Sequence, residues 1–326
     1  MAPMLKSLAA LAFYARFAVP FSTIGHRRRL ADAPAPPFDF RGQRWWVTGA
    51  TGGIGRAIAL GALAGGAEVW ALARDNAKLV ALRTAARAHA PRLHAVQTDL
   101  ASVAAVRAVA RHSSRIDVLV HNVGVMLHQH GRTAEGVETS FATNLLAPFA
   151  MTEGLRVSGA LDARSLVISM SSGGAYGAKL DVDALEPRDA ATHDGFMAYA
   201  QHKRAQIELT RWWNAQADGP RALAMHPGWV DTEGVRSSLP GFRRALQSVL
   251  RTPAQGADTA LWLAATRPAP HADGGLWLDR HRDPEHAFAL TRGGASAEAL
   301  VEFLRRRLVA VDAAHATRAA YANANA

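Results

Sequence analysis

The sequence contains no cysteine, and only four of its 37 basic lysine and arginine residues are lysines. Without cysteine, disulfides and thiolate metal sites are excluded. Among the 14 histidines, His128 and His130 lie two residues apart, with no carboxylate at metal-ligand spacing beside them, so we expect no metal. The interleaving of aromatic and basic residues that is typical of ribonucleoprotein modules is also missing, so we expect no nucleic-acid partner.

A long uninterrupted apolar run is missing too. The segment 5–21 is apolar, but Arg16 interrupts it and Pro20 ends it. It is therefore too short and too broken to span a bilayer, which takes about 20 apolar residues. We interpret residues 1–40 as an appendage: an apolar helix, a basic run at residues 27–29 and a Pro-rich linker.

Two placements of this appendage are open. The helix either lies on a membrane surface, with Arg27, Arg28 and Arg29 reaching anionic headgroups, or docks on the chain's own domain. The first placement predicts a cytoplasmic protein with peripheral membrane contact through residues 1–30. The net charge of +10 also favours anionic partners, which include phosphorylated cofactors.

From residue 41 onward, short apolar runs alternate with longer segments of helical periodicity. This alternation predicts βαβ units and a Rossmann-type doubly wound α/β fold, with a parallel sheet covered by helices on both faces. No linker divides residues 41–312, so we expect one domain, followed by a frayed tail at 313–326. We expect about seven strands, at 44–48, 67–74, 93–100, 116–124, 165–174, 221–228 and 274–279, with helices at 76–89, 102–111, 135–156, 195–217 and 253–265.

A glycine-rich turn follows the first expected strand, with the pattern Thr48-Gly49-x-x-x-Gly53-Ile54-Gly55. Glycine lets the backbone turn sharply and approach a pyrophosphate without a Cβ in the way. The helix that begins near Ile54 would point its free N–H groups at the phosphates. A turn of this kind between a strand and a helix predicts a dinucleotide site.

A second pattern lies in the segment MAYAQHKRAQIEL, residues 197–209. Tyr199 and Lys203 are four residues apart, which places their side chains on one face of a helix. A free tyrosine has a pKa near 10, too high for efficient proton transfer at neutral pH. An ammonium group beside the phenol would lower that pKa, so this pair is a candidate acid–base centre.

The two patterns, in this order, resemble the short-chain dehydrogenase/reductase family over residues 41–280. Asn144 matches the family's helix asparagine, and HNVG at 121–124 matches its N-N-A-G segment at Asn122 and Gly124. His121 and Val123 depart from that segment. A closer resemblance, carried by residues 171–180, 195–210, 225–242 and 254–264, is to the dehydrogenase/reductase member 12 subgroup of the family.

The resemblance implies hydride transfer between a nicotinamide and a carbonyl or alcohol group, with Tyr199 as proton donor and acceptor. Lys203 would favour the phenolate and hold the nicotinamide ribose. Ser172 would polarise the carbonyl, with Ser171 as the alternative, and Asn144 would hold a water that relays protons to Lys203 or serve only as a buried structural residue. The implied cofactor-binding residues are Thr48, Gly49, Thr51, Gly53, Ile54, Gly55, Arg74, Asp99, Leu100, Asn122, Gly124, Tyr199, Lys203, Pro227, Gly228, Val230 and Thr232.

The choice of cofactor depends on the end of the second strand. Arg74 stands there, and by resemblance an arginine at this place implies NADP(H) rather than NAD(H), because its fork suits a 2′-phosphate. Arg56 would add positive charge. Asp75 opposes this interpretation, since a carboxylate can accept hydrogen bonds from a free ribose 2′-hydroxyl.

Two inserts bear on the substrate. Residues 176–196 separate Ser172 from Tyr199 and predict a flap, and residues 233–246 predict a second, mobile one. An apolar pocket is predicted by four side chains: Trp229, Leu239, Pro240 and Phe242. We therefore expect a carbonyl reductase whose substrate is apolar or lipid-like. The alternative is a catalytically silent cofactor-binding scaffold or redox sensor of the same fold; a homo-oligomer is one of the assemblies that the sequence allows.

Overall fold

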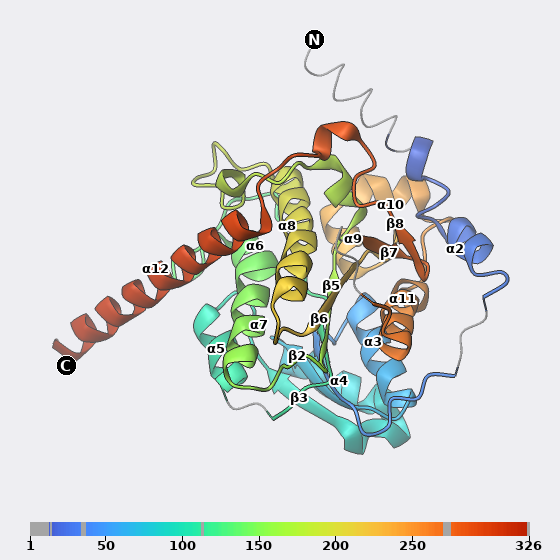
Figure 1. Ribbon diagram of the computed structural model, residues 1–326, viewed down its shortest axis with the longest axis horizontal. Helices are drawn as coiled ribbons and strands as arrows, with labels where there is room; N and C mark the ends of the chain where they lie inside the picture. Colours follow the sequence, from blue (N-terminus) through green and yellow to red (C-terminus); the bar gives the residue numbers. More distant parts are fainter. Residues whose placement is uncertain (1–12, 14, 34–36, 112–113, 270–274, 325–326) are drawn as a thin grey trace, which may run out of the picture.

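The computed structural model describes residues 13, 15–33, 37–111, 114–269 and 275–324. An eight-stranded sheet forms its centre, in the order β3-β2-β1-β4-β5-β6-β7-β8 (Figure 1). β1 to β7 run parallel, and β8 pairs antiparallel with β7. The strands are β1 (Arg44–Thr48), β2 (Glu68–Ala73), β3 (Leu93–Gln97), β4 (Val118–His121), β5 (Leu166–Met170), β6 (Arg221–Met225), β7 (Leu276–Leu278) and β8 (His281–Asp283).

Alternating side chains of the strands fill two cores, one on each face of the sheet. Trp45 and Val47 of β1 pack with one set of helices, and Trp46 packs with the other. The first set is α3 (Gly53–Ala64), α4 (Asn76–Ala86) and α11 (Pro253–Thr266). The second set includes α5 (Val103–Arg111), α7 (Ala147–Val157) and α8 (Gly195–Ala215), on the opposite side of the sheet in Figure 1. The doubly wound fold is confirmed, with one strand more than expected.

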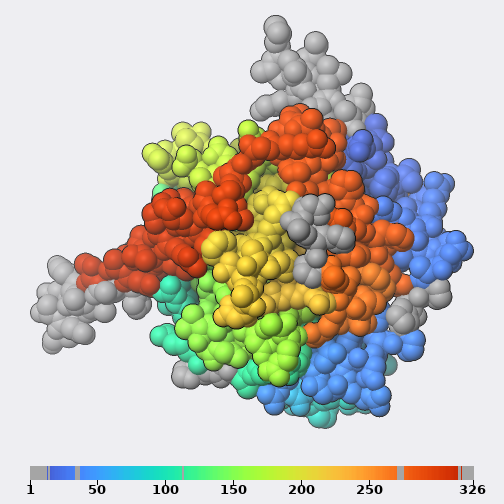
Figure 2. Space-filling view, viewed as in Figure 1, coloured from blue at the N-terminus to red at the C-terminus, as the bar shows by residue number. Residues whose placement is uncertain are grey.

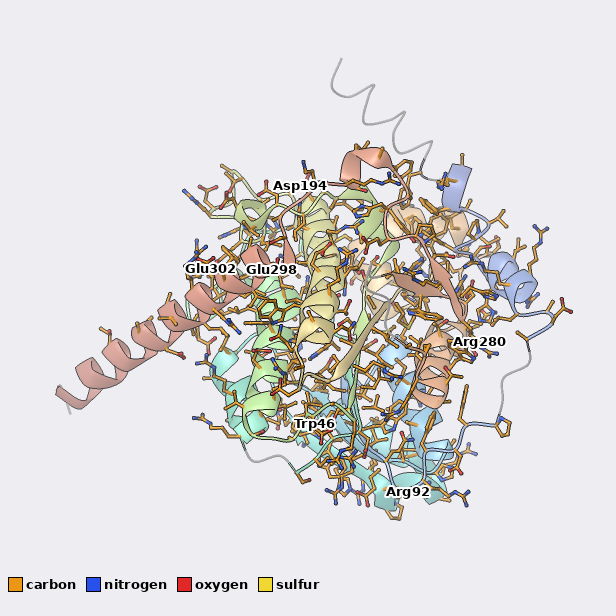
Figure 3. The ribbon with its side chains drawn as sticks, in the orientation of Figure 1. Trp46, Arg92, Asp194, Arg280, Glu298 and Glu302 are labelled. Carbon is orange, nitrogen blue, oxygen red and sulfur yellow. The ribbon has the colours of Figure 1, made fainter. Side chains whose placement is uncertain are left out.

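The expected helix at 135–156 is divided in the structure. It starts at Thr139 as α6 (Thr139–Phe141), widens into the π-helical turn η2 (Ala142–Leu146) and continues as α7. The π turn lies at Asn144, a residue of the predicted site, and such turns occur frequently at functional sites. At the start of α8, Asp194 accepts hydrogen bonds from the N–H groups of Phe196 and Met197, both at 3.1 Å (Figure 3).

The expectation of a frayed tail from residue 313 is wrong. Helix α12 (Ala297–Ala324) runs through this region, because its alanine-rich sequence has a high helix propensity. Leu300, Leu304 and Leu308 are buried against the domain. Beyond them the helix extends away from the body of the molecule (Figure 1).

The N-terminal residues that the structure describes dock on the domain. Phe17 and Phe21 are 7% and 1% exposed, and the ring of Phe17 stacks on that of Tyr176 at 5.1 Å. Figure 2 shows this blue segment lying against the orange surface formed after residue 250. Helix α2 (Thr23–Arg29) ends in an ion pair, 2.6 Å long, between Arg29 and Asp283. The expectation that Arg29 reaches outward together with Arg27 and Arg28 is therefore wrong. Residues 1–12 lie outside the described part of the chain.

A buried arginine ties this segment to the domain. Arg251 donates to the carbonyl oxygens of Pro20, Phe21 and Ser22 at 2.8, 3.0 and 3.2 Å. Its remaining bonds include a two-pronged pair with Asp279, at 2.6 and 2.8 Å. Farther along, Phe40 is fully buried beside α3. Within the described residues, the expected appendage thus packs on the domain through the buried side chains of Phe17, Phe21 and Phe40.

None of the helices within the described residues is long and apolar enough to cross a membrane.

Candidate active site

The carboxyl ends of β1 and β4 are locked together by two polar side chains. The Thr48 hydroxyl donates to the Val120 carbonyl at 3.2 Å and accepts from the Asn122 N–H at 2.9 Å. The Asn122 amide in turn donates to the Thr48 carbonyl at 3.0 Å. These reciprocal bonds fix the start of the glycine turn, and ligands bind at this edge of an open α/β sheet.

The glycine turn forms a cradle that side chains would fill. Gly49 and Gly53 have φ angles of +64° and +49°, which L-residues rarely adopt. A Cβ on Gly55 would lie 2.3 Å from the Gly49 carbonyl oxygen. Helix α3 starts here, and its N-cap, Gly52, offers no side chain to its free N–H groups. The turn therefore fits the pyrophosphate of a dinucleotide; Thr51 and Ile54 are partly buried within it.

The end of β2 and the start of α3 carry exposed positive charge. Arg74 and Arg56 are both exposed. Asp75 caps α4 through a bond, 3.1 Å long, from the Lys78 N–H to its carboxylate. One oxygen of Asp75 thus serves its own helix, whereas the Arg74 side chain is exposed to solvent.

The predicted residues after β3 take local roles. The Asp99 carboxylate accepts from the Ala101 N–H at 3.0 Å and stabilises its own turn, and Leu100 beside it is 8% exposed. Both lie at the carboxyl end of β3, beside the end of β2.

Lys203 is buried between α8 and the sheet, with its ammonium beneath Tyr199. Its Nζ donates to the Met170 carbonyl at 2.7 Å and to Gln206 Oε1 at 3.2 Å, and lies 5.5 Å from the centre of the Tyr199 ring. Burial lowers the pKa of Lys203 to about 7. A Cβ on Gly124 would lie 3.0 Å from this Nζ, so the glycine of the HNVG segment leaves room for it.

The two candidate serines have different partners. The Ser171 hydroxyl donates to the backbone carbonyl of Lys203 at 2.7 Å, so it holds α8 against the end of β5. Burial raises the pKa of the Tyr199 phenol, and a side-chain hydrogen bond with Ser172 opposes this rise. This direction differs from the expected lowering of the Tyr199 pKa, because burial is the largest contribution. Ser172 and Tyr199 thus face the same point, because a Cβ on Gly174 would lie 3.7 Å from the Ser172 Oγ and 3.7 Å from the Tyr199 ring, whereas the Ser171 hydroxyl is engaged with α8.

Asn144 is fully buried and fully bonded. Its side chain accepts from the Val125 N–H at 2.7 Å and donates to the Val125 carbonyl at 2.8 Å. Its amide nitrogen also lies 3.2 Å from His202 Nδ1. The backbone carbonyl of Asn144, which lies in the π turn, accepts a hydrogen bond from Gln206 Nε2 at 2.8 Å. Asn144 therefore joins the loop after β4 to α8.

The segment after β6 closes over the glycine turn. Arg251 donates to the Pro227 carbonyl at 3.1 Å, and Gly228 has a φ of +75°. Val230 is 3% exposed and packs on Gly256 of α11. Thr232 caps α9 (Glu233–Ser238), with its methyl group 3.0 Å from the place of a Cβ on Gly53. Thr232 therefore lies beside Gly53, and Val230 lies beside Gly256, next to Ile54; the contacts of Pro227 and Gly228 are with Arg251 and Phe21.

The two expected flaps differ in their anchoring. Residues 176–196 are bonded along α8, since Gln201, His202 and Arg204 each hold a backbone carbonyl of this insert. The insert is thus held against α8, and its role as a flap over the substrate stays a prediction. The second insert forms α9 and α10 (Pro240–Leu246), where Phe242 packs edge-on against Trp229 at 5.2 Å.

Three side chains of the site had no signal in the sequence patterns: Gln206, His202 and Arg251. Each bonds a residue 17 or more positions away, up to 231 for Arg251, and the additional bond of Gln206 to Lys203, three residues away, has no family pattern to mark it. His121 is the exception. It departs from the family pattern at a named position, and it proves to be buried, with Nε2 at 2.8 Å from Thr152 Oγ1.

Comparisons with known proteins agree with this geometry. A family model described as short chain dehydrogenase matches residues 44–179. Dehydrogenase/reductase SDR family member 12 of Bos taurus is 38% identical over 230 residues, which cover 68% of this chain and 72% of that protein. Polyprenol dehydrogenase of Mus musculus is 33% identical over 237 residues, covering 67% of this chain and 70% of that protein.

A solved structure of a candidate NAD(P)-dependent gluconate 5-dehydrogenase from Beutenbergia cavernae, with bound NADP, has a TM-score of 0.55 and 26% identity. The match covers 71% of this chain and 92% of that chain. The identity with the bovine relative, over most of its length, confirms the resemblance seen in the motifs. The chain belongs to the short-chain dehydrogenase/reductase family and is an NAD(P)-dependent oxidoreductase with a Rossmann-type fold.

Proposed function

We propose that the protein reduces an apolar or lipid-like carbonyl compound with NADPH, or oxidises the corresponding alcohol with NADP⁺. The observation that carries the proposal is the grouping of three side chains: Ser172 Oγ and the Tyr199 ring each lie 3.7 Å from the place of a Cβ on Gly174, and Lys203 Nζ lies 5.5 Å from the centre of that ring. When bound, the cofactor supplies or accepts the hydride at the carbonyl carbon.

The residues of the chain divide the remaining work. Ser172 donates a hydrogen bond to the carbonyl oxygen and stabilises the negative charge that develops there. Tyr199 gives its hydroxyl proton to this oxygen during reduction and takes it back during oxidation. Lys203 stabilises the tyrosinate, since an opposite charge nearby favours the ionised form. We propose that it also holds the nicotinamide ribose, and that Asn144 fixes the loop beside it.

The preference for NADP(H) rests on Arg74. Its exposed guanidinium follows β2 directly, where the 2′-substituent of the adenosine ribose lies in this fold, and Arg56 adds a second positive charge. Asp99 and Leu100 would border the adenine, and Pro227, Gly228, Val230 and Thr232 the nicotinamide. Support for the cofactor itself comes from the bound NADP in the structural relative.

The apolar character of the substrate rests on two observations. Trp229 and Phe242 pack together beside the segment that covers the cradle. One relative is a polyprenol dehydrogenase, whose name states a lipid alcohol. We propose that such a substrate lies against α10, and that exposed residues near the N-terminus bring a cytoplasmic protein into peripheral contact with a membrane.

Turnover with a panel of aldehydes, ketones and long-chain alcohols, followed at the absorbance of NADPH, tests the proposal. Tyr199→Phe is the matched variant, because it removes only the hydroxyl group. We expect turnover in the wild type, a loss of at least about 10³-fold in kcat in the variant, and unchanged NADPH affinity. Tight NADPH binding with no turnover on the whole panel would point instead to a cofactor-binding scaffold or redox sensor.

A further inference from the structure

Side chains of one stretch of helix α8, residues 201–206, contact two different neighbours. Gln201 and His202 donate to the insert, to Lys179 and Leu185 carbonyls at 2.7 Å each. Lys203 and Gln206 face the other way, toward β5 and η2. Gln206 is 2% exposed, so its amide must find its partners inside the protein.

Gln206 joins two groups of the candidate site. Its Nε2 donates to the Asn144 carbonyl at 2.8 Å, and its Oε1 accepts from Lys203 Nζ at 3.2 Å. A carbonyl can only accept and an ammonium can only donate, so the amide fits between them in a single orientation. Because both of its ends are matched, this side chain defines where the Lys203 ammonium lies.

The surrounding bonds hold Asn144 equally firmly. Its amide nitrogen donates to the Val125 carbonyl and lies beside His202 Nδ1, and His202 Nε2 lies 2.7 Å from the Leu185 carbonyl. The amide nitrogen of Asn144 can only donate, and the Leu185 carbonyl can only accept. His202 therefore accepts at Nδ1 and carries its proton on Nε2. A continuous set of bonds thus runs from the insert through Asn144 and Gln206 to Lys203.

We propose that Gln206 is a positioning residue of the active site: its amide takes the place, between the Asn144 carbonyl and Lys203, where the sequence predicts a relay water. An amide has no group that ionises near neutral pH. Lys203 is therefore held by Gln206 on one side and exchanges its proton on the side of Tyr199.

The charge environment of Lys203 makes this link measurable. The partners of its Nζ, the Met170 carbonyl and the Gln206 amide, are both neutral. The titratable groups that face it are Tyr199 and His202 on α8 and His121 on β4, with Glu138 beyond His202. A carboxylate at position 206 would be the nearest negative charge, so we expect it to change the titration of Lys203.

The experiment is NMR of the full chain labelled at lysine Cε, which gives few signals because the sequence has only four lysines. Gln206→Glu places a carboxylate at the link, and we expect the midpoint of the Lys203 titration to rise by about 1–3 pH units. Gln206→Met keeps the shape without the bonds, so the midpoint should fall. Gln216→Glu adds the same charge at the C-cap of α8, 13 positions and therefore roughly 20 Å from Lys203, and should leave the midpoint within about 0.3 units. Wild-type midpoints in both Gln206 variants would overturn the proposal.

Turnover provides a second readout, which rests on the proposed function. In Gln206→Met we expect kcat to fall about tenfold at neutral pH, with the alkaline limb of its pH profile at lower pH, while Gln216→Glu keeps the wild-type profile. An unmoved profile in Gln206→Met would overturn the positioning role alone. A wild type without turnover, whose Lys203 titration still responds to Gln206→Glu, would overturn the oxidoreductase proposal and leave Gln206 as the residue that positions Lys203.

Discussion

Arg74 is exposed at the end of β2, and Asp75 beside it caps α4. A charge-assisted hydrogen bond is worth about 1.5–3 kcal/mol, or roughly 10- to 100-fold in affinity. We therefore expect Arg74→Ala to weaken NADPH binding by about tenfold or more and to leave NADH within about twofold. Fluorescence titration with both cofactors measures this. Arg83→Ala, on the exposed side of α4, is the control, and an equal loss for both cofactors would contradict the placement of the 2′-phosphate.

His121 stands where the family pattern has asparagine. Burial, together with the nearby charge of Lys203, lowers its pKa to about 3. Between that pH and about 6.5, the ordinary histidine pKa, the unfolded chain binds a proton that the folded chain does not. Acidification through this range therefore favours unfolding, by about 1.4 kcal/mol per pH unit for one histidine.

His121→Asn removes this contribution. We expect the free energy of unfolding, measured by urea denaturation between pH 6.5 and 4, to fall less steeply with decreasing pH, by about 1.4 kcal/mol per unit. His202 and His226, whose pKa values burial also lowers, remain in the variant, so some slope persists. His89→Asn on the surface serves as the control; a variant slope equal to that of the wild type would show that His121 is protonated in the folded protein.

The sequence predicts those site residues whose role follows from local spacing. The turn at Thr48 to Gly55 needs glycine because the backbone itself is crowded there, and Tyr199 and Lys203 share a helix face at four residues' distance. Gln206 and Arg251 act across contacts that only the folded chain creates. An isolated glutamine on a helix is typical of a solvated surface, so nothing in its neighbours indicated that it is buried.

At the level of elements, the N-terminal segment is part of the site's support. The Phe21 ring lies against Gly173, next to Ser172: a Cβ on Gly173 would be only 2.6 Å from the Phe21 ring. The same phenylalanine packs edge-on with Trp229 at 5.7 Å. Its backbone carbonyl accepts from the N–H of Trp229 at 2.8 Å. The segment thus braces both the serine loop and the segment after β6.

This arrangement predicts that Phe21→Ala destabilises the whole domain. Removing a fully buried phenylalanine costs about 3–5 kcal/mol, a large part of the 5–15 kcal/mol that stabilises a typical domain. Urea denaturation measures the loss. Ile24→Ala, on the same segment but 41% exposed, should change stability by no more than about 0.5 kcal/mol. If both variants were as stable as the wild type, the segment would be a dispensable appendage.

Elements were predictable where hydrophobic periodicity is strong. The parallel strands β1, β2, β4, β5 and β6 are nearly continuous apolar runs, since both faces of the sheet are buried there. β8 has the sequence His-Arg-Asp and lies at the sheet edge, where one neighbour suffices, so it carries no apolar pattern. The break of the helix at η2 follows from the contacts of Asn144 with Val125 and Gln206, which no helical pattern encodes.

At the scale of the molecule, the docked N-terminal segment keeps two apolar and two basic side chains exposed to solvent. Val19 and Ile24 are 45% and 41% exposed, and Arg27 and Arg28 are exposed beside them. The chain as a whole carries a net charge of +10. Apolar and basic groups together on one segment are typical of a surface that contacts anionic lipid. The docked helix is therefore compatible with the proposed peripheral contact, through its outer face alone.

Binding to vesicles of phosphatidylserine and phosphatidylcholine tests this contact. Each arginine near an anionic surface contributes about 1 kcal/mol, so we expect the double variant Arg27→Ala/Arg28→Ala to lower the partition coefficient by roughly 30-fold. The same reduction should follow from raising the salt concentration to 1 M, where the Debye length is about 3 Å. Arg83→Ala/Arg111→Ala removes equal charge from exposed positions on α4 and α5. Equal effects of the two double variants would mean that the net charge of the molecule, and not this segment, attracts the vesicles.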